Sequence, residues 1–142
     1  MTTQIAVLAY NEERRIALCL DSLPLGEPGI AVAVVVNGSS DATSEIVRGY
    51  TDRGVRLVEY AQGGKARSWN RFMLDEAPEA ASYVFVDGDA QLLPGTVQGL
   101  VRCLRDNPRA NAAAGMPRNG RRAAHYRQML AEEHGLFGDC YA

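Results

Sequence analysis

Residues 30–41 have the sequence IAVAVVVNGSSD, and this stretch indicates the fold class most directly. Its first seven residues are apolar and mostly β-branched, which favours a strand. A strand that is apolar on both faces is typical of a parallel sheet covered by helices on both sides. The polar loop that follows would lie at the carboxyl end of this strand, where open α/β sheets bind their ligands.

Strand and helix patterns alternate on both sides of this stretch. Apolar runs of strand length are separated by segments in which apolar residues recur at helical spacing. Besides 30–36, strands are predicted over residues 5–9, 55–60 and 83–86, a weak fifth strand over 110–116, a last helix over 121–134 and a further strand within 136–142. The pattern predicts one domain, residues 1–142, with an α/β fold and a single, mostly parallel sheet flanked by helices.

Length and composition exclude several classes of protein. The chain has 142 residues, 46% of them apolar, and a net charge of −2. This length is sufficient to bury a core, and the composition excludes a disordered tail or a small disulfide scaffold. Without a strongly basic balance, we expect no nucleic-acid partner.

Cysteine usage and apolar runs indicate the compartment. The three cysteines, Cys19, Cys103 and Cys140, show no metal-type spacing, which indicates reduced thiols. We expect Cys19 and Cys103 to be buried as small apolar residues of helices. No basic signal segment opens the chain, and its longest apolar run is far too short to span a bilayer. The sequence therefore predicts a cytoplasmic protein without a transmembrane segment.

Four of the predicted strands end in polar or glycine-rich clusters. The clusters are Asn11-Glu12-Glu13, residues 37–41, Gly63-Gly64-Lys65 and Asp87-Gly88-Asp89. Because the carboxyl ends of parallel strands meet at one edge of a sheet, we expect the four clusters to come together there. Two carboxylates in one cluster and a lysine after two glycines in another indicate a site for an anionic ligand of several parts.

The cluster Asp87-Gly88-Asp89 carries the sharpest chemical signal. If the strand continues through it, both carboxylates point to the same side. Two hard oxygen ligands favour Mg²⁺ or Mn²⁺ over Zn²⁺. An ion held there could bridge two phosphate oxygens as a diphosphate leaves, and Gly88 would let a bulky ligand approach the backbone. The alternative is a turn whose aspartates cap the next helix.

The other clusters offer groups for the rest of such a ligand. Gly63-Gly64-Lys65 lacks the Walker pattern, but a glycine turn brings backbone amides and a helix N-terminus close to a ligand. The loop 37–41 offers an amide, hydroxyls and a carboxylate for a nucleobase or ribose. For Asp41 the favoured alternative is a helix cap, and Asn11 is likewise expected to cap the helix that follows it.

Four motifs, in this order, resemble those of family 2 glycosyltransferases. The sequence AYNEE at 9–13 looks like the opening motif of that family, and NGSSDAT at 37–43 is similar to its nucleotide-binding loop. Gly64-Lys65-Ala66 with Asn70 resembles the third motif, and Asp87-Gly88-Asp89 looks like the metal-binding carboxylate motif, DxD. Each motif alone is loose, but the ordered set is specific and extends over nearly the whole chain.

The resemblance implies an A-type glycosyltransferase fold, a nucleoside-diphosphate-sugar donor and a divalent metal ion, Mg²⁺ or Mn²⁺. It implies that Asp89 ligates the metal between the two phosphates and so serves catalysis, and that Asp87 faces the ribose or the metal. Lys65 would lie beside the nucleoside, and Asn37 would hydrogen-bond the base. The other positions that it assigns to the donor pocket are Ala9, Asn11, Glu12, Gly38, Gly64 and Gly88.

The sequence departs from the family pattern at three places. Leu8 stands where the family usually has proline, and Asn37 replaces a frequent aspartate, so that a charge is lost. The chain ends at Ala142, before the acidic residue that deprotonates the acceptor in the family. The expectation is a domain truncated after its donor-binding half, with the acceptor and the catalytic base unidentified.

Three functions are compatible with these features. The first is a metal-dependent glycosyltransferase that moves a sugar to an acceptor hydroxyl, with inversion. The second is a non-catalytic nucleotide-sugar-binding fragment or assembly module. The third is a sugar-phosphate nucleotidyltransferase, against which the acidic residues Glu12 and Glu13 argue, because they would repel a triphosphate. A homo-oligomer is also possible, because a bare sheet edge near residues 136–142 invites pairing.

Overall fold

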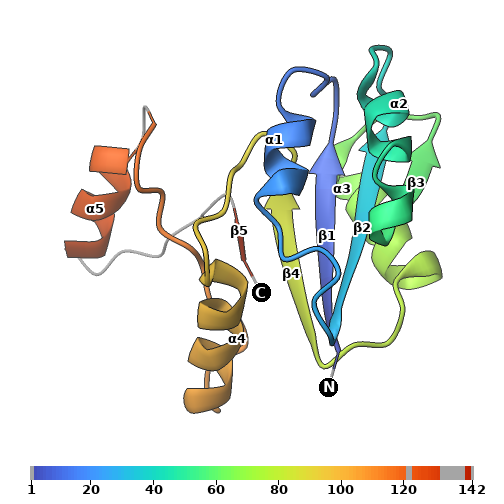
Figure 1. The fold of residues 1–142 in the computed structure, drawn as a ribbon. Coiled ribbons are helices and arrows are strands. Elements are labelled where there is room, and N and C mark those ends of the chain that lie inside the picture. The colour runs from blue at the N-terminus through green and yellow to red at the C-terminus, as the bar shows by residue number, and fades with distance from the viewer. Residues whose placement is uncertain (1, 121–122, 132–139, 142) are drawn as a thin grey trace.

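The computed structural model describes residues 2–120, 123–131 and 140–141 and contains one five-stranded sheet (Figure 1). The strand order is β3-β2-β1-β4-β5. The first four strands are parallel, and β5 pairs antiparallel with β4. The bounds are Thr3–Ala9 for β1, Ile30–Asn37 for β2, Val55–Tyr60 for β3, Ser82–Asp87 for β4 and Cys140–Tyr141 for β5. The predicted α/β fold with a mostly parallel sheet is confirmed.

Helices cover both faces of the parallel strands. Figure 1 shows α1 and α2 on one face and α3 on the other, with α4 and α5 beyond β4. The helix α3 continues directly into a π-helical turn, η2. The bounds are Ile16–Asp21 for α1, Thr43–Arg48 for α2, Thr51–Arg53 for the 3₁₀ turn η1, Lys65–Arg71 for α3, Phe72–Glu76 for η2, Thr96–Asp106 for α4 and Ala123–Ala131 for α5.

The central strand β1 divides the core into two layers. Its odd-numbered residues, such as Ile5 and Val7, pack with Ile16 and the other buried residues under α1 and α2. Ala6 and Leu8 pack on the opposite face, with Phe72 of η2. Every residue of β1 is buried. This two-sided burial explains why residues 5–9 and 30–36 are apolar, whereas the edge strand β3 carries the exposed residues Arg56 and Glu59. The parallel direction of the four strands places their carboxyl ends at one edge of the sheet.

The first helix begins later than expected, and Asn11 does not cap it. The helix α1 starts at Ile16, after a turn in which the Glu12 carbonyl accepts hydrogen bonds from the amides of Arg15 and Ile16. Asn11 has φ of 51°, a left-handed conformation that asparagine tolerates better than most residues. Its side-chain Oδ1 accepts a hydrogen bond from the Ser40 amide at 2.9 Å instead, so Asn11 joins two loops.

The predicted strand at residues 110–116 is wrong, since only an isolated bridge at Ala114 forms there. The segment is rich in alanine and has no β-branched residue, so it lacks strand propensity. The helix α5 and the strand β5 lie within the two last predicted elements; residues 121–122, 132–139 and 142 lie outside the described residues. Cys19 is buried as expected, whereas Cys103 is exposed on α4.

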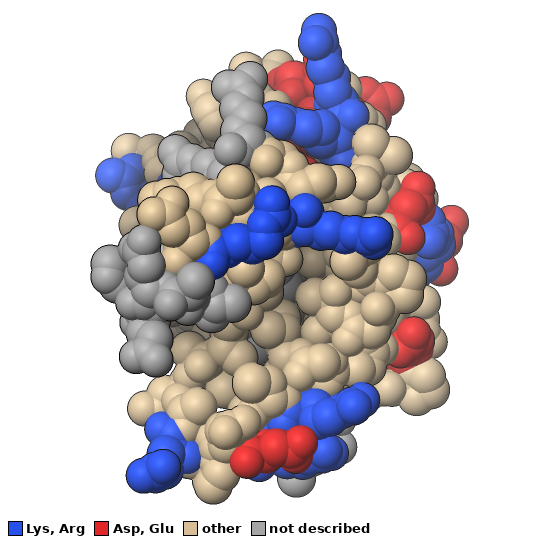
Figure 2. Space-filling view, turned by 90° about the vertical axis from the view of Figure 1, so that its left-hand side faces the viewer, with Lys and Arg blue, Asp and Glu red and all other residues tan. Residues whose placement is uncertain are grey.

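The surface carries both signs of charge. On the face shown in Figure 2, Lys and Arg side chains form separate groups divided by uncharged surface, and acidic side chains lie close to several of them.

Within the described parts of the chain, no helix is both long enough and apolar enough to cross a bilayer.

Candidate functional site

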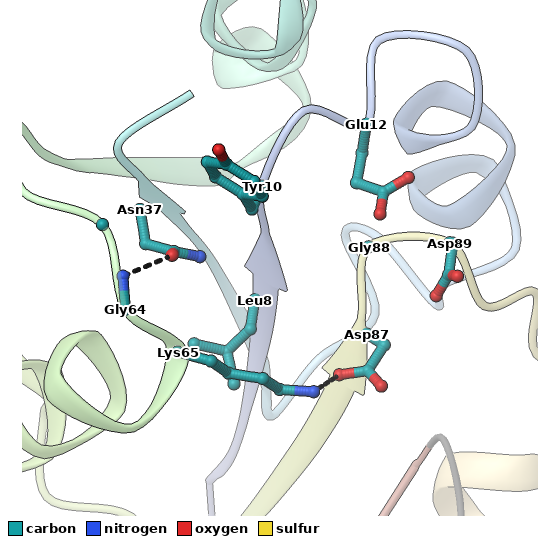
Figure 3. A pocket seen from close by; sticks show the side chains of 10 residues that line it. Leu8, Tyr10, Glu12, Asn37, Gly64, Lys65, Asp87, Gly88 and Asp89 are labelled. Carbon is teal, nitrogen blue, oxygen red and sulfur yellow. Dashed lines mark hydrogen bonds and ion pairs between the residues drawn. The ribbon is translucent and has the colours of Figure 1, made fainter. Parts of the chain in front are cut away.

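A pocket of about 550 Å³ lies at the carboxyl edge of the parallel sheet (Figure 3). All four polar clusters of the sequence contribute to its wall, because β1, β2, β3 and β4 end side by side. The residues that line it are Leu8, Tyr10, Glu12, Asn37, Gly63, Gly64, Lys65, Asp87, Gly88 and Asp89. Figure 3 shows Tyr10, Asn37 and Gly64 on one side of the pocket and Asp87, Gly88 and Asp89 on the other.

Most of the residues singled out from the sequence line this pocket. They are Glu12, Asn37, Gly64, Lys65, Asp87, Gly88 and Asp89. Three others do not line it. Ala9 is fully buried beneath it, Asn11 is exposed and turned toward the next loop, and Gly38 packs against Gly63.

Sequence reasoning did not assign the lining residues Leu8 and Tyr10, and it singled out Gly63 only as part of the cluster Gly63-Gly64-Lys65. Tyr10 is the most informative of these, because the residue remains 56% exposed although it directly follows a fully buried strand. An aromatic residue at the first position after a buried strand was the available signal. Leu8 forms part of the pocket wall between the two sides (Figure 3).

Asn37 connects three segments at the wall of the pocket through its side-chain amide. Its Nδ2 donates a hydrogen bond to the Ala9 carbonyl at 3.0 Å, and its Oδ1 accepts one from the Gly64 amide at 3.2 Å. The residue is only 4% exposed. The amide group therefore ties the ends of β1 and β2 to the glycine loop that precedes α3.

A close backbone contact sets the position of that glycine loop. Gly38 has φ of 71°, and a Cβ placed on it would lie 2.7 Å from the Gly63 nitrogen and 2.9 Å from the Gly63 Cα. The Gly38 amide also donates to the Tyr60 carbonyl at 2.7 Å. Only glycine fits this position, so the loop after β2 and the loop after β3 pack backbone to backbone.

The loops that follow β1 and β2 are joined by a reciprocal set of hydrogen bonds. The Glu13 amide donates to Asp41 Oδ2 at 3.1 Å, and the Ala42 amide donates to Glu13 Oε2 at 3.1 Å. Asp41 Oδ1 accepts from the Thr43 amide at 3.0 Å. Burial raises the pKa of Asp41, but hydrogen bonds from the Thr43 hydroxyl and from backbone amides outweigh it and lower the pKa overall. Asp41 thus accepts a hydrogen bond from the first residue of α2, but the N-cap of that helix is Ala42, whereas the alternative interpretation expected Asp41 there.

The two aspartates of the DxD cluster each have a basic neighbour. Asp87, the last residue of β4, forms an ion pair with Lys65. Asp89 Oδ2 lies 3.5 Å from an Arg15 guanidinium nitrogen. Their side chains are 32% and 44% exposed, so both carboxylates are accessible from the pocket.

Because Gly88 has no side chain, the end of β1 can pack closely against it. A Cβ on Gly88 would lie 3.1 Å from the Ala9 Cβ and 3.2 Å from the Leu8 carbonyl oxygen. The Gly88 amide donates to that same carbonyl at 2.9 Å. Gly88 therefore fastens the DxD turn to the end of β1, and it also lines the pocket.

The carboxylate pair suits a metal ion that is shared with a ligand. Among the described residues, no three acidic, histidine or cysteine groups gather closely enough to hold an ion by themselves. Mg²⁺ sites commonly use only one or two protein carboxylates together with substrate phosphates, and carboxylate and water ligands suit Mn²⁺ as well. Asp87 and Asp89 fit that donor set, and the pocket beside them has room for phosphates.

Glu12 lines the pocket close to Asp89 (Figure 3). Its Oε2 accepts from Arg15 Nε at 2.9 Å. Burial is the largest influence and raises the pKa of Glu12; the Arg15 charge opposes this, and the negative charges of Asp89 and Asp41 add to it. The pocket therefore holds an acidic group whose ionised form is disfavoured by its surroundings.

Solved structures of glycosyltransferases share this fold. Glucosyl-3-phosphoglycerate synthase from Mycobacterium tuberculosis, in complex with Mn²⁺, UDP and glucosyl-3-phosphoglycerate, matches with a TM-score of 0.73 and 25% identity over 99% of this chain. The mannosyltransferase PcManGT from Pyrobaculum calidifontis, in complex with GDP-Man and Mn²⁺, matches with a TM-score of 0.70 and 27% identity over 82%. TarS 1-349 from S. aureus matches with a TM-score of 0.68 and 25% identity over 85% of this chain.

This chain spans only part of each of those proteins. It covers 56% of the synthase, 35% of PcManGT and 37% of TarS 1-349. A comparison with curated proteins finds no match. The glycosyl transferase family 2 model, in contrast, matches residues 4–139, which is nearly the whole sequence. With its motifs in order and its fold shared with solved transferases, the chain belongs to glycosyl transferase family 2.

Proposed function

We propose that the pocket binds a nucleoside diphosphate sugar together with Mg²⁺ or Mn²⁺, and that the chain is the donor-binding part of a glycosyltransferase that moves the sugar to an acceptor hydroxyl. One observation carries the proposal. A carboxylate pair, a lysine and an exposed aromatic ring line a single pocket at the carboxyl edge of a parallel sheet, where open α/β sheets bind ligands.

The acidic side of the pocket would receive the diphosphate through the cation. Asp87 and Asp89 would hold Mg²⁺ or Mn²⁺, which would neutralise charge on the departing diphosphate. The ion pair between Lys65 and Asp87 has to open or rearrange when that happens. Lys65 has an exposed ammonium group and can then turn to a phosphate oxygen while it remains at the pocket wall.

The opposite side would receive the nucleoside. Tyr10 presents a largely exposed ring to the pocket, and a nucleobase can stack on such a ring. Asn37 is already hydrogen-bonded to Ala9 and Gly64, so it would act on the base through the lone pair of Oδ1 that remains or by fixing the Gly63-Gly64 loop. Glu12 would accept a hydrogen bond from a hydroxyl group of the donor.

The proposed transfer step is a displacement at the anomeric carbon of the donor sugar. The acceptor oxygen forms a bond to the anomeric carbon while the bond from that carbon to the diphosphate oxygen breaks, and the diphosphate takes the electron pair. Attack from the face opposite the diphosphate inverts the anomeric centre. The hydroxyl proton passes to a base, and we assign no residue of this pocket to that role. The chain's own residues contribute by orienting the donor and stabilising the leaving group.

A thermal-shift panel tests the proposal. UDP-, GDP-, dTDP- and ADP-sugars are each added with and without Mn²⁺, and the melting temperature is measured. We expect one donor to raise it, and more with Mn²⁺ than without, by binding linkage. The matched control is Asp106→Asn, an exposed aspartate at the end of α4, which should respond like wild type, whereas Asp89→Asn should lose the Mn²⁺-dependent part. A panel with no stabilisation, or an Asp89→Asn response equal to wild type, contradicts it.

A further inference from the structure

Arg15 joins two acidic groups of the pocket. Its Nε lies 2.9 Å and one terminal nitrogen 2.8 Å from Glu12 Oε2, while the other terminal nitrogen lies 3.5 Å from Asp89 Oδ2. The residue directly precedes α1, and Asp89 follows β4, so the guanidinium links loops that are far apart in the sequence. Without it, Glu12 and Asp89 would face each other as like charges.

The contact with Asp89 is exposed and readily exchanged. The Arg15 side chain is 56% exposed and that of Asp89 is 44% exposed. Ion pairs of this kind are weak because water screens them. The contact with Glu12 is closer, and the Glu12 side chain is only 15% exposed. Arg15 can therefore release Asp89 while its guanidinium stays anchored on Glu12.

We propose that Arg15 is a built-in counter-ion that competes with the divalent cation for Asp89. This inference rests on the proposed function, in which Asp89 is a metal ligand. A cation at Asp89 and the guanidinium cannot both approach Oδ2 closely, because like charges repel. Arg15 thus weakens binding of the cation alone and, once displaced, adds positive charge at the edge of the pocket where the diphosphate would lie.

The test is a titration with Mn²⁺ alone, followed by calorimetry and by the loss of the free-ion electron paramagnetic resonance signal. Arg15→Gln should bind Mn²⁺ about two- to fivefold more tightly than wild type. Arg14→Gln is the matched control, since it removes the same charge from the neighbouring exposed residue and should stay close to wild type. Arg15→Lys keeps the charge but loses the planar fork, and should lie between wild type and Arg15→Gln.

The outcomes separate this inference from the proposed function. A role of Arg15 in folding alone would lower the melting temperature and weaken Mn²⁺ binding, so tighter binding has no such explanation. Suppose that Asp89→Asn loses Mn²⁺ binding. If the Mn²⁺ affinity of Arg15→Gln is then equal to or weaker than that of wild type, or if Arg14→Gln shows the same gain in affinity, the inference about Arg15 is overturned and the metal site stands. If Asp89→Asn binds Mn²⁺ like wild type, or if neither wild type nor any variant binds it, the inference about Arg15 and the proposed metal site are both overturned.

Discussion

The ammonium group of Lys65 forms an ion pair with the carboxylate of Asp87 across the pocket (Figure 3). Lys65 is the first residue of α3, and Asp87 is the last residue of β4. The pair therefore connects the glycine loop after β3 with the carboxylate cluster after β4. In the proposed complex, the cation and the diphosphate replace this contact.

Substitution of Lys65 should weaken nucleotide binding selectively. Lys65→Gln removes a charge-assisted contact to phosphate, and we expect the dissociation constant of the stabilising nucleoside diphosphate to rise by roughly tenfold or more, as measured by calorimetry in the presence of Mn²⁺. Arg67→Gln, two residues further along α3 and also exposed, should have little effect. Equal losses in the two variants would show that only the overall charge matters.

Asn37→Asp should destabilise the fold, and more at neutral than at acidic pH. The variant keeps an acceptor for the Gly64 amide but places a carboxylate oxygen against the Ala9 carbonyl, which now accepts from Nδ2 at 3.0 Å. Burial and this repulsion raise the pKa of the introduced carboxyl in the folded state. Its stabilising contribution is therefore present below its unfolded pKa of about 4 and is lost as pH rises through the folded pKa.

The measurement for Asn37→Asp is urea unfolding at several pH values. We expect a loss of about 2 kcal/mol at neutral pH and a smaller loss near pH 4, where the protonated carboxyl can donate to Ala9. Asn11→Asp is the control, because the exposed Asn11 side chain uses its Oδ1 as the acceptor for Ser40. A pH-independent loss at Asn37 would mean that the amide does not brace the strand ends.

Gly38→Ala should cost more stability than the same change at another left-handed glycine. Gly26 has φ of 77° with open space where a methyl group would lie, whereas at Gly38 the methyl carbon would meet the Gly63 nitrogen at 2.7 Å. Gly26→Ala should cost about 1–2 kcal/mol from backbone conformation alone. Gly38→Ala should exceed that in urea unfolding and should also weaken nucleotide binding, because the loop has to shift. Equal costs would rule out a tight loop contact.

The raised pKa of Glu12 has a consequence for stability. Burial, the largest influence, favours its protonated form, so the folded protein holds this proton more tightly than the unfolded chain, whose reference pKa is 4.5. The contribution is fully present below that value and is lost as pH rises through the folded pKa. Relative to Glu12→Gln, wild type should lose unfolding free energy as pH rises from 4.5 through the folded pKa. A relative gain would indicate that the Arg15 ion pair dominates.

The parts of the fold that depend on local pattern could be predicted. The run 30–36 is mostly β-branched and apolar on both faces, and it forms the interior strand β2, which pairs in parallel with both of its neighbours. The polar clusters at the strand ends meet because sheet geometry alone brings them together. The strand predicted over residues 110–116 was wrong because the segment is mostly apolar but has no β-branched residue. An apolar composition alone does not distinguish a strand from a loop.

The details of the site depend on contacts between distant loops. The sequence shows that Asn37 follows a strand, but not that Ala9 and Gly64 take both ends of its amide. Likewise, nothing in the spacing indicates that Arg15 lies between Glu12 and Asp89. These hydrogen-bond and ion-pair partners depend on how the loops fold over the edge of the sheet. The spacing of residues within one segment does not indicate that arrangement.

The most direct test is a crystal structure with the stabilising nucleoside diphosphate and Mn²⁺, in which the anomalous scattering of manganese locates the ion. We expect the anomalous peak within bonding distance of a carboxylate oxygen of Asp89 or Asp87 and of the diphosphate, with the base beside Tyr10. A nucleotide bound elsewhere, or a manganese peak away from both aspartates, would contradict the account.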